Sequence, residues 1–100
     1  MLITITTRHC DIPEDLRARA RARLERLGKR APRSHHLTLI FSAEHGQSGV
    51  ELELHTNRRQ VHFATGAGVD HRTALDRAVA KLGRQMSKTP VRRPPVRGAR

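Results

Sequence analysis

The 100-residue sequence has few aromatic residues, a single cysteine and no long apolar run, and each shortage excludes a class of protein. With two Phe and no Tyr or Trp, its core must consist mainly of aliphatic side chains. The single Cys10 excludes an internal disulfide bond and suits a reducing compartment. Apolar runs of only a few residues exclude a membrane-spanning helix, and we expect no signal peptide. A chain of this length is enough for one domain and too short for two.

Basic residues are in large excess. Lys and Arg number 20 against 9 Asp and Glu, which gives a net charge of +11 at pH 7. A compact domain with this charge repels itself and attracts polyanions such as nucleic acids. Residues 90–100 contain Pro and Arg, no acidic residue and no helical or strand periodicity. We therefore expect a cytoplasmic protein with a folded domain at residues 1–89 and a disordered basic tail at residues 90–100.

The spacing of apolar residues predicts the secondary structure. Alternation of apolar and polar residues, typical of strands with one buried face, is found in four segments: 2–7, 36–43, 50–55 and from residue 61 to the glycines at 66 and 68. Helical spacing is found in two segments, one from Pro13 to Gly28 and one after Asp70, which suits an N-cap. Turns are expected at residues 46–49 and 57–60.

The resulting order, β-α-β-β-β-α, predicts an α+β fold. Each strand has one apolar face and each helix one apolar stripe, so a two-layer sandwich buries every apolar face once. We expect a four-stranded sheet with both helices on one face, and Val61 and Phe63 turned toward the helices. The other face should be polar and exposed to water, formed by Thr4, Thr38, Ser42, Glu51, Glu53, His55 and His62.

Both predicted helices carry cations on the side opposite their apolar residues. In the second helix, apolar residues at 75, 79, 82 and 86 are each followed two positions later by a cation, namely Arg77, Lys81, Arg84 and Lys88. Two residues turn a helix by about 200°, so these cations face away from the core. The first helix has a second stripe of Arg19, Arg23, Arg26 and Arg30, with Lys29 beside it. Because like charges at this spacing destabilise a helix, two such stripes predict a nucleic-acid-binding surface.

The sequence contains no recognisable catalytic or metal site. If the last hairpin turns at Arg58 and Arg59, His55 and His62 face each other, but two ligands make a weak metal site. Cys10 has no partner cysteine, and both Phe residues are expected on inner strand faces, which leaves no exposed ring for base stacking. We therefore expect a binding protein, not an enzyme, with no cofactor, no metal, no small-molecule substrate and no membrane partner.

Three parts of the sequence together resemble the ribosome hibernation-promoting factor and ribosome-associated inhibitor family, in its short form. They are a first strand ending in Arg8-His9, an acid-capped helix with Leu16-Arg17 and Leu24-x-x-Leu27, and a last helix with Asp76-x-x-x-x-Lys81-Leu82-x-Arg84-Gln85. The resemblance covers about residues 1–89. The last-helix segment is its most specific part.

The resemblance implies a function. In that family a βαβββα domain binds the small ribosomal subunit at the interface side, in the channel for mRNA and tRNA. There it blocks translation and preserves idle ribosomes under stress. It implies rRNA contacts for the helix cations, namely Arg77, Lys81, Arg84, Lys88, Arg19, Arg23, Arg26, Lys29 and Arg30, and also for Arg8 at the end of the first strand.

Two other functions stay open at this stage. The first is a general binding module for structured RNA or DNA without ribosomal preference, which bulk competitor RNA would reveal. The second is a small metal- or thiol-dependent enzyme that uses Cys10 or the histidines. Ribosome binding that persists after Cys10→Ser, in a protein that contains no metal, would argue against the enzyme.

Overall fold

The computed structural model describes residues 1–88; the expected tail at 90–100 and the side chain of Lys88 lie outside the described part. Its elements are β1 (Leu2–Arg8), α1 (Glu14–Lys29), β2 (Ser34–Glu44), β3 (Gln47–Thr56), β4 (Val61–Gly68) and α2 (His71–Lys88). The predicted α+β class and the β-α-β-β-β-α order are confirmed. Neither described helix combines the length and the apolar character needed to cross a bilayer.

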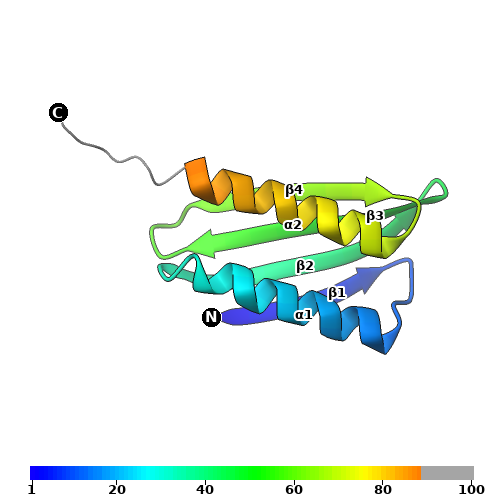
Figure 1. The fold of residues 1–100 in the computed structure, drawn as a ribbon, viewed down its shortest axis with the longest axis horizontal. Coiled ribbons are helices and arrows are strands. Elements are labelled where there is room, and N and C mark those ends of the chain that lie inside the picture. Colours follow the sequence, from blue (N-terminus) through cyan, green and yellow to red (C-terminus); the bar gives the residue numbers. More distant parts are fainter. Residues whose placement is uncertain (89–100) are drawn as a thin grey trace.

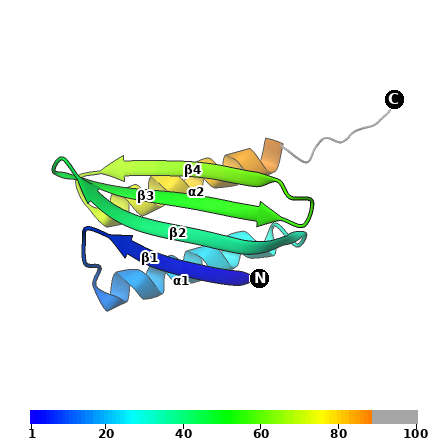
Figure 2. The same ribbon diagram turned by 180° about the vertical axis from the view of Figure 1, so that it is seen from behind.

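The four strands form one sheet in the order β1-β2-β3-β4. β1 pairs with β2 in parallel because α1 lies between them in the chain, whereas the β2–β3 and β3–β4 pairs are antiparallel. Both helices cover the same face of the sheet (Figure 1), and the opposite face carries no helix (Figure 2). The first hairpin is tighter than expected, because only His45 and Gly46 form its turn and Gly49 lies inside β3.

The core lies between the sheet and the helices and is mostly aliphatic, as expected from the shortage of aromatic residues. Fully buried large side chains come from β2, β3 and both helices: Leu24, Leu37, Leu39, Phe41, Val50, Leu52, Leu54, Leu75 and Leu82. The inner side chains of β1, Ile3 and Ile5, are half-buried against this core. Each element therefore buries the apolar face that its sequence pattern predicts, with β4 as the exception.

The register of β4 contradicts the expected orientation of its side chains. Ala64 pairs with Leu52 and Gly66 with Val50, so the small residues face the helices. Val61 and Phe63 point to the uncovered face, where they are 52% and 49% exposed. His62 pairs with Leu54 and therefore turns inward, whereas the sequence pattern placed it on the open face.

The close approach of α2 explains this register. A Cβ atom added at Gly66 would collide with the Ala74 carbonyl oxygen and lie 2.6 Å from the Ala78 nitrogen. The backbone of α2 thus rests directly on that of β4, and a large inner side chain at this position has no room. Gly66 does not end the strand, as the sequence suggested, but allows the helix to pack on it.

Candidate nucleic-acid interface

The two helices lie side by side and run in the same direction (Figure 1). Arg23 Nη1 of α1 lies 2.5 Å from Asp76 Oδ1 of α2. Two helical turns further on, Arg30 Nη2 donates to the Gly83 carbonyl oxygen at 3.3 Å. Both pairs are separated by 53 positions in the sequence, so the helices stay in parallel register along this length. The two predicted cation stripes therefore belong to one continuous surface.

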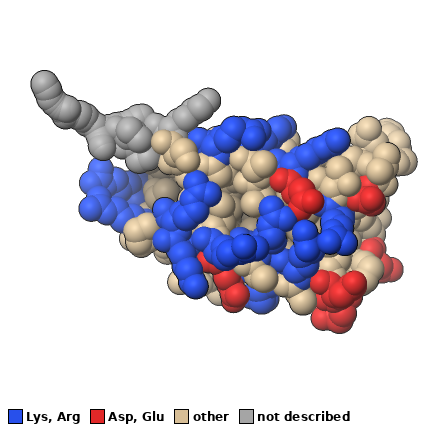
Figure 3. Space-filling model, in the orientation of Figure 1, with Lys and Arg blue, Asp and Glu red and all other residues tan. Residues whose placement is uncertain are grey.

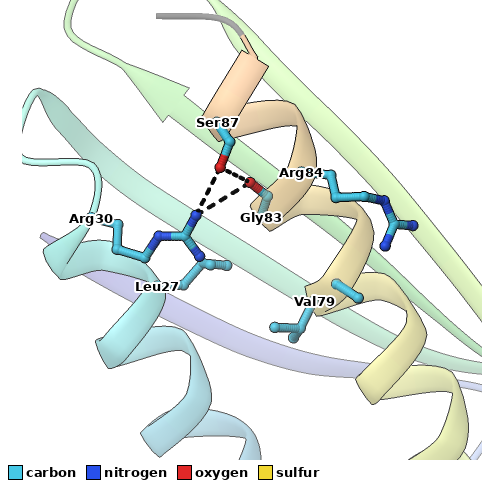
Figure 4. A pocket seen from close by; sticks show the side chains of 7 residues that line it. Leu27, Arg30, Val79, Gly83, Arg84 and Ser87 are labelled. Atoms are coloured by element: carbon cyan, nitrogen blue, oxygen red, sulfur yellow. Dashed lines mark hydrogen bonds between the residues drawn. The ribbon is translucent and has the colours of Figure 1, made fainter.

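Arg30 spans the groove between the helices at their C-terminal ends (Figure 4). Besides the Gly83 carbonyl, its guanidinium contacts Ser87 Oγ at 3.2 Å. Gly83 is buried, and a Cβ atom at this position would lie 3.2 Å from Arg30 Nη1. The missing side chain at Gly83 therefore makes room for the guanidinium, and Arg30 fastens α1 to α2. Figure 4 also shows Arg84 directed away from Arg30.

Five of the predicted cations are exposed and have no ion-pair or hydrogen-bond partner within residues 1–88: Arg19, Arg26, Lys29, Lys81 and Arg84. We call these five the basic helix surface. Lys and Arg side chains dominate the helix-covered side of the molecule, and acidic side chains gather at one end (Figure 3). That end includes the first turn of α1, with Glu14 and Asp15. The basic helix surface is thus bounded by acids at the N-terminal end of α1.

Edge-strand carbonyls engage some of the helix side chains. Arg77 Nη1 donates to the Ala67 carbonyl oxygen at 2.6 Å, and Gln85 Nε2 donates to the Phe63 carbonyl oxygen at 2.8 Å. On the other edge, Arg17 Nη1 lies 3.4 Å from the Ile5 carbonyl oxygen. These contacts occupy carbonyls that could otherwise pair with a foreign strand. Arg77 therefore has a structural contact in addition to its place in the stripe.

A hollow between α2 and β4 gathers three cations. Arg77, Lys81 and Arg84 line it together with the small residues Gly66, Ala67 and Ala80. Among residues 1–88, no acidic side chain lines this hollow. Three positive groups around a shallow depression without a counter-charge form a suitable place for a phosphate.

Arg8 lies apart from the other predicted site residues. It extends from β1 over the uncovered face of the sheet, where its Nη2 is 2.5 Å from Glu51 Oε2. The helices cover the opposite face, so the structure does not bring Arg8 together with the basic helix surface. Lys88 is the last residue of α2.

Asp70 fixes the start of α2. Its Oδ1 accepts a hydrogen bond from the Thr73 backbone N–H at 2.7 Å, as the N-cap prediction requires. The backbone and side-chain hydrogen bonds from Thr73 lower the pKa of the Asp70 carboxyl, with a further contribution from the charge of Arg72. The first turn of α2 contains no acidic residue, so the Asp70 carboxylate supplies the negative charge that stabilises the N-terminus of the helix.

The expected histidine pair does not form. His55 pairs with Val61, so His55 and His62 lie on opposite faces of the sheet. His55 instead stacks on His36, with ring centroids 5.7 Å apart. Residues 1–88 contain no group of three or more His, Cys, Asp or Glu side chains that could hold a metal. Cys10 is half-buried, and its Sγ lies 3.5 Å from the Phe41 carbonyl oxygen.

The sequence pattern did not identify two groups of exposed residues. Arg33, Arg58 and Arg59 are exposed at the β3–β4 hairpin end of the sheet, and Val61 and Phe63 are exposed beside them. The alternation at 61–68 is ambiguous, because apolar residues occupy one set of positions and small residues the other. The two glycines at alternate positions are the signal that could have indicated a helix packed closely on this strand.

Comparison with known proteins identifies related chains. The sequence model of the family described as Sigma 54 modulation protein / S30EA ribosomal protein matches residues 3–93. A ribosomal subunit interface protein from Coxiella burnetii has a similar structure, with a TM-score of 0.80 and 23% identity over 88% of this chain and 96% of that one. The N-terminal domain of Thermus thermophilus Protein Y gives a TM-score of 0.74 and 21% identity over 88% of this chain and 98% of that one. No curated protein sequence matches the chain.

Proposed function

The chain belongs to the Sigma 54 modulation protein / S30EA ribosomal protein family, and from this membership we propose that it binds the small ribosomal subunit and inhibits translation. The proposed site is the mRNA and tRNA channel on the interface side. The bound protein would exclude mRNA and tRNA by occupying their space, and would keep idle ribosomes inactive under stress. This function needs binding and no chemistry, and it places the protein in the cytoplasm.

The basic helix surface is the observation that carries this proposal. Its five cations have no acidic partner within the described residues, so their charge is available to an external anion. Lys81 and Arg84 are one helical turn apart, or about 5 Å along the axis, which is close to the spacing of phosphates on a nucleic-acid strand. The same side chains line the hollow beside β4, where a phosphate could be contacted from two sides.

The rigidity of this surface favours folded RNA as the ligand. The two cation rows run from Arg19 to Arg30 and from Arg77 to Lys88, so each is about 17 Å long. The Arg23–Asp76 ion pair and the contacts of Arg30 hold the rows in fixed register. Two rows in fixed register match the phosphates of one RNA shape better than those of a flexible strand. Arg23, Arg30 and Arg77 then serve to position the rows as well as to add charge.

Residues outside the helices have secondary roles in this proposal. We propose that residues 1–89 are the ribosome-binding domain and that the basic residues at 90–100 add phosphate contacts of low specificity. Lys88 extends the α2 row. Arg8 would meet rRNA only from the sheet side, because it extends over the uncovered face.

Co-sedimentation with purified small ribosomal subunits tests the proposal. The protein should remain on the subunits in the presence of excess bulk RNA, and the double variant Lys81→Glu/Arg84→Glu should lose this binding. The matched control is Arg21→Glu/Arg72→Glu, which changes the net charge equally at exposed positions outside the basic helix surface. Its binding should stay within a few fold of wild type, because those residues lie outside the basic helix surface.

Two outcomes would contradict the proposal. Transfer of the wild-type protein to bulk RNA would indicate a general module for structured RNA, with the family fold but no ribosome specificity. Equal loss of binding in both double variants would indicate that net charge, and not the helix surface, determines the affinity.

A further inference from the structure

The uncovered face of the sheet carries an exposed group of ring-bearing and apolar side chains. His36, His55 and Val61 are neighbours across three strands, because His36 pairs with His55 and His55 with Val61. Phe63 follows two residues after Val61 on the same face. We call these four residues the aromatic patch; it lies on the face seen in Figure 2, which no helix covers.

The rings of the aromatic patch lie at the surface of the sheet, where His36 and His55 are half-buried and Phe63 is exposed. The His36 and His55 rings are stacked at 5.7 Å with an interplanar angle of 29°. Phe63 is 49% exposed on the edge strand, diagonally across from His55. Diagonal neighbours on antiparallel strands are about 7–8 Å apart, so the histidine pair and Phe63 present two separate ring positions.

A cationic rim adjoins the patch. Arg58 and Arg59 form the tip of the β3–β4 hairpin, and Arg33 is held beside it by the bond from the Asn57 N–H to the Arg33 carbonyl oxygen at 2.7 Å. A hollow lined by His35, His55, Thr56, Asn57, Arg59, Gln60 and Val61 joins this hairpin to the patch. The three arginines are exposed and have no side-chain partner within the described residues.

The backbone at Arg59 supports a role for its side chain. Arg59 has φ of 63°, in the left-handed region that favours Gly or Asn. This conformation costs an arginine of the order of 1 kcal/mol relative to glycine. Gly would therefore make this turn more stable, and Arg59 instead places a guanidinium at the rim of the hollow.

Glu51 and Glu53, the acids of this face next to the patch, do not cancel that charge. Glu51 is engaged by Arg8, with the two side chains 2.5 Å apart. Glu53 Oε1 lies 3.2 Å from His55 Nε2, so it has a partner inside the patch. The arginines at the hairpin therefore remain free to bind an anion next to exposed rings. Rings for stacking beside cations for phosphate are the combination found in sites for single-stranded nucleic acid.

We propose that the aromatic patch binds unpaired bases of single-stranded RNA by stacking, with the phosphates on Arg33, Arg58 and Arg59. This site lies on the face opposite the basic helix surface and uses different chemistry, since it contacts bases and not only phosphates. It does not depend on ribosome binding. The charge at its rim favours RNA over an apolar protein segment as the occupant.

A pair of RNA oligomers tests the proposal on the full chain. Fluorescence anisotropy measures the affinity for a labelled oligouridylate of about 12 nucleotides and for an abasic oligomer of the same length and charge. The ratio of the two affinities isolates the contribution of the bases. We expect the wild-type protein to prefer the base-containing oligomer, and Phe63→Ala to reduce this preference about tenfold.

Three further variants identify the cause of any loss. Phe63→Trp should keep the preference, because it retains a ring, whereas Phe63→Leu should lose it, because it keeps apolar area without one. Thr65→Ala, at an exposed position on the same strand, is the matched control and should change nothing. Lys81→Glu/Arg84→Glu should weaken the binding of both oligomers equally and leave their ratio unchanged. This last result separates the patch from the basic helix surface.

Several outcomes would overturn the proposal. Equal wild-type affinity for both oligomers would show that only phosphates are bound, and unaltered affinity in Phe63→Leu would show an apolar contact that suits a protein partner. If Phe63→Ala does not fold, NMR of the wild-type protein decides. The base-containing oligomer must then shift the amides of β3 and β4 more than the abasic one, and equal shifts reject the site.

Discussion

Arg23 and Asp76 join the two helices: the guanidinium Nη1 of Arg23 lies 2.5 Å from Asp76 Oδ1, across the groove between α1 and α2. Asp76 thus has a role that its position beside Arg77 did not suggest. It uses one cation of the basic stripe to fix the distance between the two stripes. The ion pair is partly exposed, with 23% and 48% of the two side chains accessible, so water weakens it.

Replacing Asp76 should separate its effects on stability and on binding. Asp76→Asn should lower the free energy of unfolding by about 0.5–1 kcal/mol, because the pair is only partly buried. It should also tighten binding to small ribosomal subunits at low salt, because Arg23 becomes free and a negative charge is removed. Thermal unfolding and co-sedimentation measure the two effects. The control Glu25→Gln removes the same charge from an exposed residue of α1 without an ion-pair partner among the described residues, so it should leave stability unchanged.

Salt dependence should report the phosphate contacts of α2. Each Lys or Arg bound to a phosphate contributes about one to the slope of log affinity against log salt concentration. Lys81→Gln/Arg84→Gln should therefore reduce the slope for small subunits by about two. Titration at several salt concentrations measures it, with Arg21→Gln/Arg72→Gln as the control of equal charge. An unchanged slope in the Lys81/Arg84 variant would mean that neither side chain contacts a phosphate.

Substitution of two glycines should change stability in opposite directions. Gly66→Ala should destabilise the fold by about 1–3 kcal/mol, because the added Cβ meets the backbone of α2 at Ala78. Gly28→Ala, inside α1, should stabilise it by up to about 1 kcal/mol, because alanine favours the helix and the added Cβ meets only the flexible end of Met1. Denaturant unfolding measures both. A stable Gly66→Ala protein would contradict the close packing of α2 on β4.

Two adjacent residues of α2 should differ sharply in their tolerance of an acid. Leu82 is fully buried, so Leu82→Asp should cost several kcal/mol and unfold the domain. Lys81 is exposed, so Lys81→Asp should leave the fold intact and weaken only RNA binding. Circular dichroism shows whether each variant is folded. A folded Leu82→Asp protein would contradict the assignment of the two faces of α2.

Asp70 should make part of the stability depend on pH. Its pKa is lower in the folded protein than in the unfolded chain, because Thr73 donates hydrogen bonds to the carboxylate. The stabilisation is therefore present above the unfolded pKa and is lost as the pH falls through the folded one. Asp70→Asn keeps a side chain that caps the helix but does not titrate. Its melting temperature should fall less than that of wild type between pH 5 and pH 3, and identical pH profiles would exclude this contribution.

The patterns in the sequence predicted most of the fold, since they depend on local periodicity. Six elements, their order and the apolar stripe of α2 followed from residues such as Leu75 and Leu82, which recur at helical spacing. The family resemblance rested on three parts of the sequence, most specifically on the last helix, and is confirmed by the family match over residues 3–93. The phosphate-binding roles of the cations stay predictions, because binding depends on a partner.

The orientation of β4 could not be predicted, because its two possible faces differ only in what packs on them. Val61 and Phe63 are more apolar than Ala64 and Gly66, and an isolated strand would bury them. α2 lies so close that only small side chains fit beneath it, and this reverses the preference. For the same reason, His62 turns inward and does not face His55, and the Phe63 ring is exposed although the sequence pattern predicted that it would be buried.

The sequence by itself determined the α+β class, the excess of positive charge and the side of each helix that carries it, because these follow from composition and from spacing within one element. Only the tertiary structure decided which cations are free and which are engaged. Arg8, Arg23, Arg30 and Arg77 each bind a group more than nine residues away in the chain, whereas Lys81 and Arg84 have no hydrogen bond or ion pair with any described residue. Such contacts arise when separate elements pack together, and no periodicity within one element records them.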